Sequence, residues 1–229
     1  MRASDLQVPV GILDSPEVAV DRLRLSGAVV VPGFARGAWL EDLQRDHIAA
    51  FTAGSSNAVP TRYRVETKSR ALRITSSRLP EELDAVRRFV LDERIRGIAH
   101  HYLGPQARVS EAAYLTLDLP DGRPVTRVHY DRIHALKAFL YLTDTDIGNG
   151  ALELVPGSVT RGRTRRLAGL GAGIAVVDLP ITDGHGGEVP LPVVGPAGTL
   201  IIFDTDCLHR GGRLNPPHVR RILRSHSHA

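Results

Sequence analysis

The sequence is poor in cysteine and in aromatic residues, and both shortages narrow the class of protein. Cys207 is the single cysteine, so no disulfide can form within the chain and nothing indicates an oxidising compartment. Aromatic residues make up 5% of the chain. They do not show the alternation with basic residues that proteins binding single-stranded nucleic acid would require. The sequence shows neither a signal-peptide pattern nor an apolar run approaching the roughly 18 residues of a membrane span. We therefore expect a cytoplasmic protein without nucleic-acid or membrane partners. We expect Cys207 to be a small half-buried strand-end residue and not a catalytic or ligand residue.

The residues that are present suit one globular domain. The 229 residues are 42% hydrophobic, which suffices for a sizeable core, whereas two independent domains would be cramped. We expect a single domain over 1–229, with helices and the first strands in 1–105 and a metal-bearing barrel core in 106–229. The formal net charge of +4 permits anionic substrates without requiring them. The sequence leaves the oligomeric state open.

The order of helical and strand patterns indicates helices around a β-barrel. Ser15 and Pro16 are a typical N-cap and first helical residue, and Gly27 is a typical helix end. Helical spacing also covers 35–53 and 81–103, whereas strand patterns cover 28–31, 109–119, 135–142, 199–203 and 220–224. Short strands with turn signals, preceded by helices, predict a mainly β fold with flanking helices, the double-stranded β-helix or jelly-roll. We expect His226 and His228 to lie in a frayed tail.

Two histidines and an aspartate have the pattern of a metal site. His129 and Asp131 are two residues apart, and residues i and i+2 of a β-strand point to the same face. His209 follows the apolar run 199–203 and supplies a third ligand. Two histidines and one carboxylate form the facial triad of non-haem Fe(II) oxygenases, which leaves positions open for a cosubstrate and O2. An isolated pair of this kind is a weak signal, because most histidines bind no metal.

An arginine after the third ligand strengthens the interpretation. Arg220 follows His209 on the last predicted strand, and its guanidinium fork suits a carboxylate such as that of 2-oxoglutarate. Alternation sends Arg220 and Arg221 to opposite faces, and the spacing from His209 favours Arg220. Tyr114 and Thr116 share one face of the predicted strand 109–119 and are candidates to border the 2-oxoglutarate pocket. The alternative is that they are ordinary half-buried polar residues of a barrel strand.

At these residues the chain resembles the phytanoyl-CoA dioxygenase family. The resemblance rests on His129-x-Asp131, on 149–152 leading into 155–158, on 198–209, on Arg220 and on 27–34. It implies a jelly-roll enzyme that uses Fe(II), 2-oxoglutarate and O2, with His129, Asp131 and His209 as metal ligands and Arg220 binding 2-oxoglutarate. It also implies oxidative decarboxylation to succinate and CO2, coupled by default to hydroxylation. Related enzymes desaturate, epimerise or close rings, whereas halogenation is disfavoured because Asp131 is present.

The chain departs from the family where a substrate would be selected. Val159 stands where the family usually has a histidine, and 160–194 matches no family segment. The expected lid segments, 54–78 and 160–190, are rich in arginine, which fixes carboxylates and phosphates in one orientation. We therefore predict a small anionic substrate, such as an amino acid or a natural-product intermediate. Its candidate anchors are Arg62, Arg64, Arg70 and Arg73, and the alternative is that these only solvate a basic strand pair.

Two other classes of protein stay open at this point. A metal-independent jelly-roll binding or regulatory protein would keep the shell of the fold, but it would not need all four functional side chains. A cupin-like enzyme that uses its metal as a Lewis acid without 2-oxoglutarate would not need Arg220. Succinate release with Fe(II), 2-oxoglutarate and air would separate these classes from an oxygenase.

Overall fold

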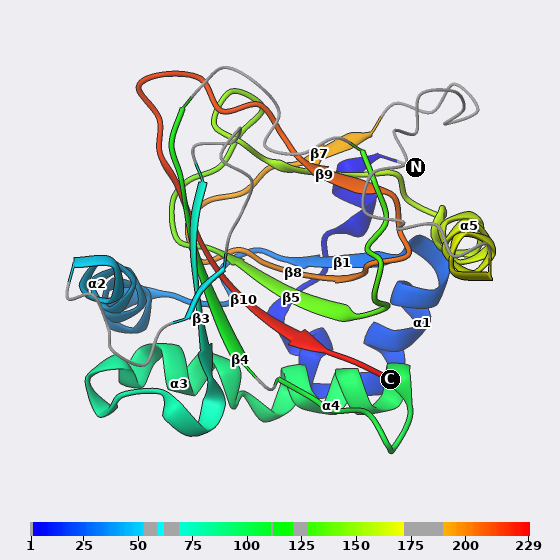
Figure 1. Cartoon of the computed structure of the whole chain (residues 1–229), viewed down its shortest axis with the longest axis horizontal. Helices are drawn as coiled ribbons and strands as arrows, with labels where there is room; N and C mark the ends of the chain where they lie inside the picture. Colours follow the sequence, from blue (N-terminus) through cyan, green and yellow to red (C-terminus); the bar gives the residue numbers. More distant parts are fainter. Residues whose placement is uncertain (1, 53–58, 62–68, 111, 121–127, 172–189) are drawn as a thin grey trace.

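The fold combines helices with antiparallel strands (Figure 1). The structure is a computed structural model, which describes residues 2–52, 59–61, 69–110, 112–120, 128–171 and 190–229. The helices are α1 (Pro16–Ser26), α2 (Gly37–Thr52), α3 (Asp84–Val90), α4 (Glu93–Leu103) and α5 (Val159–Gly171), with short 3-10 turns at Ala3–Leu6, Val10–Asp14, Ser76–Arg78 and Glu81–Leu83. The strands are β1 (Ala28–Val31), β2 (Val59–Thr61), β3 (Ser69–Thr75), β4 (Ala112–Asp118), β5 (Leu136–Tyr141), β6 (Leu152–Leu154), β7 (Leu191–Val193), β8 (Leu200–Asp204), β9 (His209–Gly211) and β10 (Arg220–Ser227).

Two antiparallel sheets make up the β part of the molecule. The main sheet has the order β1-β8-β5-β10-β4-β3-β2, and the small sheet has the order β7-β6-β9. Helices α3 and α4 run along one side of the main sheet, and β7 and β9 lie on its other side (Figure 1). The pairing of the described strands does not close the sheets into a continuous barrel. This architecture confirms the predicted mainly β jelly-roll with flanking helices.

Alternation along the strands of the main sheet separates two hydrophobic cores. The inner core lies between the sheets and includes Phe139, Tyr141, Ile201, Ile222, Leu152 and Leu154. The outer core joins the main sheet to the helices and includes Leu115, Leu140, Ile202, Leu223, Leu23, Leu43 and Phe89. Each fully buried side chain of this size contributes roughly 1.5–3 kcal/mol. Every second residue of a central strand therefore enters the space between the sheets.

Helix α1 has the predicted limits, with one difference at its start. Pro16 is its first residue, and Gly27 ends it in the left-handed region with φ of 84°. Ser15 is the N-cap residue, as predicted, but its side chain makes no capping hydrogen bond. A capping hydroxyl would accept a hydrogen bond from the N–H of Val18. This N–H instead donates to the backbone carbonyl of Ser15 at 3.1 Å.

Three stretches differ from the prediction. Within 128–135, His129 forms a single bridge to His209 and no strand is present, so the predicted metal strand is wrong. Residues 159–171, to which the sequence analysis assigned no element, form α5. His226 is not frayed, because β10 lies between β4 and β5, and His228 exchanges backbone hydrogen bonds with Arg108. None of the helices in the described ranges is long and apolar enough to cross a membrane.

Candidate active site

His129, Asp131 and His209 come together beside the inner face of the main sheet. One ligand atom from each lies within 4.8 Å of the other two, and both Nε2 atoms are 3.5 Å from Oδ1 of Asp131. The backbones of His129 and His209 exchange hydrogen bonds of 2.9 and 2.8 Å, and the Asp131 N–H donates to the Thr205 carbonyl at 3.0 Å. Pairing with the chain around His209, rather than alternation along a strand, therefore brings the three side chains together.

The hydrogen bonding of His209 fits a metal between these atoms. Its Nδ1 lies 2.8 Å from the Cys207 carbonyl oxygen, which can only accept, so Nδ1 carries the proton and Nε2 carries the lone pair. Burial, followed by the proximity of His129, lowers the pKa of His209 to about 4, so the ring is neutral at neutral pH. The Nε2 lone pair thus faces the Asp131 carboxylate. Two acceptors in this arrangement repel each other unless a cation lies between them, and the donor set suits Fe(II).

Lys137 contacts the other oxygen of Asp131. Its Nζ comes from the inner face of β5 and lies 2.5 Å from Oδ2. Burial alone would raise the pKa of Asp131, but the positive charge of Lys137 and the contacts with His129 and His209 hold that pKa well below its usual value. Asp131 is therefore ionised, with Oδ1 facing the two histidines and Oδ2 facing the ammonium group. Lys137 was not among the predicted site residues, because nothing in its local sequence places it beside Asp131.

The three candidate ligands line a cavity of about 320 Å³ between the two sheets. The wall of this cavity includes four inward positions of β10, at 220, 222, 224 and 226. The intervening residue Leu223 belongs to the outer core, and Arg221 shares its side of the strand. The strand register therefore places Arg220, and not Arg221, in the cavity wall.

Arg220 is held by contacts that leave one edge of its guanidinium available. Its Nε and Nη2 both lie 2.8 Å from Oδ2 of Asp118, and its Nη1 donates to the Gly150 carbonyl. The Ser69 hydroxyl donates to the other carboxylate oxygen of Asp118. A guanidinium has five N–H donors, so these contacts use three and leave one on each of Nη1 and Nη2. That remaining pair suits a carboxylate bound through two hydrogen bonds.

The four arginines predicted to anchor the substrate lie in different places. Arg73 is on the inner face of β3, where its Nε donates to the Tyr114 hydroxyl at 3.2 Å. Arg70 is exposed on the opposite face of β3, so the structure does not bring it to the cavity. Arg62 and Arg64 fall outside the described residues.

Tyr114 and Thr116 both face the inner side of β4. Thr116 lines the cavity, and its hydroxyl accepts a hydrogen bond of 3.0 Å from Nη2 of Arg224. The Tyr114 ring stacks on His226, with 4.0 Å between ring centroids. Arg224 and His226 were not among the predicted site residues. Alternation along β10 from Arg220 was the signal that could have found both.

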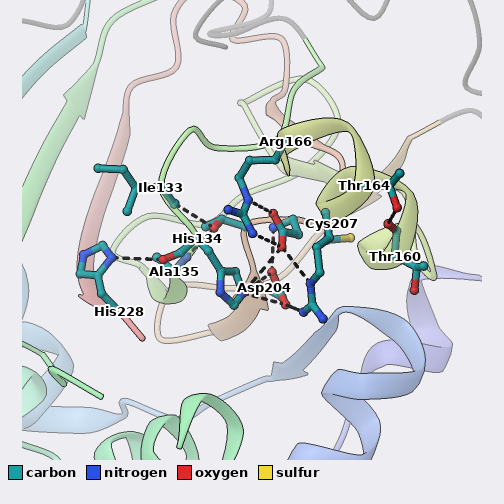
Figure 2. A network of polar contacts seen from close by, with 12 residues as sticks. Ile133, His134, Ala135, Thr160, Thr164, Arg166, Asp204, Cys207 and His228 are labelled. Carbon is teal, nitrogen blue, oxygen red and sulfur yellow. Dashed lines mark hydrogen bonds and ion pairs between the residues drawn. The ribbon is translucent and has the colours of Figure 1, made fainter. Parts of the chain in front are cut away.

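A second group of potential metal ligands, His134, Asp204 and Asp206, already has cationic partners. Arg166 of α5 donates to both carboxylate oxygens of Asp206, at 2.6 and 3.0 Å, and Nε of Arg163 lies 3.3 Å from the same carboxylate. Figure 2 shows Arg166 reaching into the network around Asp204, where His134 Nε2 lies 3.2 Å from Asp204. Because guanidinium groups neutralise these carboxylates, we interpret the cluster as the anchor of α5 on the turn before His209.

A match to a known protein family covers most of the chain. Residues 23–222 match the model of Phytanoyl-CoA dioxygenase (PhyH). The chain belongs to this family. PhyH proteins use Fe(II), 2-oxoglutarate and O2, so the resemblance seen in the sequence is confirmed, together with the cofactors and the class of 2-oxoglutarate-dependent non-haem iron enzyme. No curated protein matches the chain.

Solved structures share the PhyH fold at low sequence identity. SnoK, a non-haem α-ketoglutarate dependent carbocyclase from nogalamycin biosynthesis, is 20% identical, with a TM-score of 0.68 over 99% of this chain and 85% of SnoK. The epimerase SnoN, in complex with Fe3+, α-ketoglutarate and nogalamycin RO, is 18% identical, with a TM-score of 0.66 over 93% of this chain and 83% of SnoN. EvdMO1 is 21% identical, with a TM-score of 0.63; 93% of this chain matches it but spans only 50% of EvdMO1.

Proposed function

We propose that this PhyH protein hydroxylates a small anionic metabolite, with His129, Asp131 and His209 as ligands of one Fe(II) and Arg220 as the anchor of 2-oxoglutarate. The supporting observation is the group of three ligand atoms within 4.8 Å, in which a lone pair of His209 faces the Asp131 carboxylate. Such an arrangement of acceptors is stable around a cation, and membership of the family supports iron as that cation.

The side chains of the protein bind and orient the reactants. Bound Fe(II) and 2-oxoglutarate supply the oxidation, in which 2-oxoglutarate and O2 become succinate and CO2 and the second oxygen atom passes to the substrate. Arg220 offers its two remaining donors to the distal carboxylate of 2-oxoglutarate, while Asp118 keeps the guanidinium in place. Lys137 holds one oxygen of Asp131 and leaves the other for the metal.

The charges around the cavity support an anionic substrate. Among the described residues that line it, Lys137, Arg220 and Arg224 are cationic, whereas Asp118 and Asp131 are anionic, which leaves an excess of one positive charge. Fe(II) and the 2-oxoglutarate dianion add charges of equal size and opposite sign. The excess therefore persists when both are bound, and it favours a substrate of negative charge.

Epimerisation and ring closure are the second candidate outcome, since SnoN and SnoK are described as an epimerase and a carbocyclase. The mass of the product distinguishes the outcomes. Hydroxylation adds one oxygen atom, epimerisation leaves the mass unchanged, and ring closure or desaturation removes two hydrogen atoms.

Alanine substitutions test the metal assignment. His129→Ala, Asp131→Ala and His209→Ala should each abolish succinate formation and weaken Fe(II) binding by roughly 100-fold or more, because each removes a direct ligand. Anaerobic equilibrium dialysis measures the bound iron, and a succinate assay in air measures turnover. His218→Ala, at an exposed histidine, is the control and should leave both unchanged. Retention of iron and turnover in His129→Ala would show that the assignment is wrong.

A further inference from the structure

We infer that Arg73 and Arg224, on either side of Tyr114, form a binding site for the anionic group of the primary substrate, and that His226 adds a hydrogen-bonding group to it. This inference rests on the proposed function and names the residues that select the substrate. Arg224 and His226 line the cavity, and Arg73 and Tyr114 lie beside it on the same face of the sheet. The site is separate from Arg220, so 2-oxoglutarate and the substrate would bind different guanidinium groups.

The strand register places the three central residues in one row across the main sheet. Tyr114 of β4 lies directly opposite Arg73 of β3 on one side and opposite Arg224 of β10 on the other. Residues opposite each other on antiparallel strands point to the same face, which here is the face of the cavity. The guanidinium carbons of Arg73 and Arg224 lie 5.9 and 5.8 Å from the centroid of the Tyr114 ring. Two cations are therefore held against one aromatic ring.

The spacing of these two arginines suits one anion. Strands β3 and β10 are separated by β4 alone, so their backbones are about 10 Å apart, a distance that two arginine side chains can bridge around a carboxylate or phosphate. Neighbouring cations repel each other, and an anion bound between them removes that repulsion. Arginine also binds such groups through two hydrogen bonds, which fixes the orientation of the rest of the ligand.

His226 extends the row of binding groups towards the candidate metal. It lies two residues beyond Arg224 on β10, directly opposite Lys137, which contacts Asp131. Its ring lines the cavity and stacks on Tyr114, with 15° between the ring planes. Its Nε2 is buried and has no hydrogen-bond partner among the residues that the structure describes, which is unusual for a buried polar atom. A polar group of the substrate would satisfy this nitrogen and place the neighbouring carbon close to the metal.

The position along β10 separates this site from that of 2-oxoglutarate. Arg220 and Arg224 are four residues apart on the same face, so their backbones are about 13 Å apart. Arg220 is engaged by Asp118 and Gly150, and Arg224 contacts Thr116. The two guanidinium groups thus have different protein partners, and each can be altered while the other is kept.

The experiment uses the full chain loaded anaerobically with Fe(II) and saturating 2-oxoglutarate, whose complex is first verified by its charge-transfer absorption. Hydrocinnamate and phenylphosphonate are then titrated calorimetrically as carboxylate and phosphonate probes, and hydrocinnamyl alcohol serves as the neutral counterpart. The wild type should bind at least one of the anions and should bind the alcohol at least tenfold more weakly. Arg73→Gln and Arg224→Gln should each weaken anion binding at least tenfold. His226→Phe, which keeps a ring against Tyr114, should weaken it to a smaller extent.

Arg70→Gln is the matched control, because it removes the same charge from the exposed face of the same strand. It should bind the anions as the wild type does. If Arg224→Gln does not fold, Arg224→Lys keeps the charge without the fork, and Arg73→Gln tests the half-buried partner alone. Arg224→Lys should still weaken anion binding, because a single ammonium cannot donate the paired hydrogen bonds.

Several results would overturn the inference. In the wild type, these are equal binding of the anions and the alcohol, or no binding of either anion. In the variants, they are equal effects of Arg70→Gln and Arg73→Gln, or a loss of 2-oxoglutarate binding in Arg224→Gln as large as its loss of anion binding. Failure of the proposed function is a different observation, because the complex of Fe(II) with 2-oxoglutarate would then not form in the wild type. A complex that forms normally but binds no anion would refute the substrate site alone.

Discussion

Arg220 and Asp118 form a buried ion pair in the wall of the cavity, each almost fully buried. In Arg220→Gln, Asp118 stays behind as an uncompensated buried charge, which should lower the free energy of unfolding by about 3–5 kcal/mol. The double variant Arg220→Gln/Asp118→Asn removes both charges and should recover most of that loss. Urea unfolding of the two variants and the wild type measures the difference. A double variant no more stable than Arg220→Gln would contradict the description of this pair.

The same variants separate stability from cosubstrate binding. Both should lose 2-oxoglutarate affinity by roughly 30-fold or more, because a paired charge-assisted contact is worth about 2–5 kcal/mol. Arg221→Gln is the control, since Arg221 lies on the other face of β10. If Arg221→Gln lost 2-oxoglutarate affinity and Arg220→Gln kept it, the assigned register would be wrong.

At the scale of a single element, helix α5 packs on the turn before His209 through Gly162. A Cβ added there would clash with the Asp206 carbonyl oxygen, so Gly162→Ala must displace the helix and weaken the pair of Arg166 with Asp206. We expect this variant to lose about 1–3 kcal/mol of stability, although alanine itself favours a helix by about 1 kcal/mol. Urea unfolding provides the measurement.

Gly171→Ala is the control within the same helix, because a Cβ at that position meets no described residue within 4 Å. This variant should be as stable as the wild type or slightly more stable. Equal destabilisation by the two substitutions would show that the close approach of Gly162 to Asp206 is not what holds α5 in place.

At the scale of the whole molecule, His47 joins the helical layer to the main sheet. It is buried on α2, and its Nε2 lies 2.9 Å from the Thr116 carbonyl oxygen of β4. Burial is the main cause that lowers the pKa of His47 from 6.5 to about 4. Between these values the unfolded chain binds a proton at His47 that the folded protein does not. The contribution of His47 to the free energy of unfolding is therefore fully present above pH 6.5 and is lost as the pH falls towards 4.

The expected contribution is roughly 3 kcal/mol over this range, since one pKa unit corresponds to about 1.36 kcal/mol. His47→Gln has no such titration, so its unfolding free energy should depend less on pH than that of the wild type. Urea unfolding at several pH values between 4 and 7 compares the two. Parallel pH profiles would show that His47 is not the group responsible.

The features that could be predicted from the sequence depend on local order along the chain. Apolar periodicity, Pro16 and Gly27 placed α1 and β1. Alternation sent Arg220 and Arg221 to opposite faces, and the spacing from His209, together with the family resemblance, favoured Arg220 for the inner face. The types and spacing of His129, Asp131 and His209 indicated an iron site, and their combination with Arg220 and the segments 27–34, 149–158 and 198–209 indicated the family, without any knowledge of the fold. The reasoning about the pair His129 and Asp131 assumed a strand, however, and the structure positions them through backbone pairing with residues near His209 instead.

Only the tertiary structure decided which other side chains surround the candidate metal and the cavity. Lys137 contacts Asp131, and Asp118 contacts Arg220, because strands distant in sequence pair in one particular register. The same register places Arg73 and Arg224 on the two sides of Tyr114 and moves Arg70 to the opposite face. A shift of one residue in that pairing would turn every one of these side chains to the other face. The sequence by itself determined which residues are capable of the chemistry, and the long-range pairing of strands determined which of them meet.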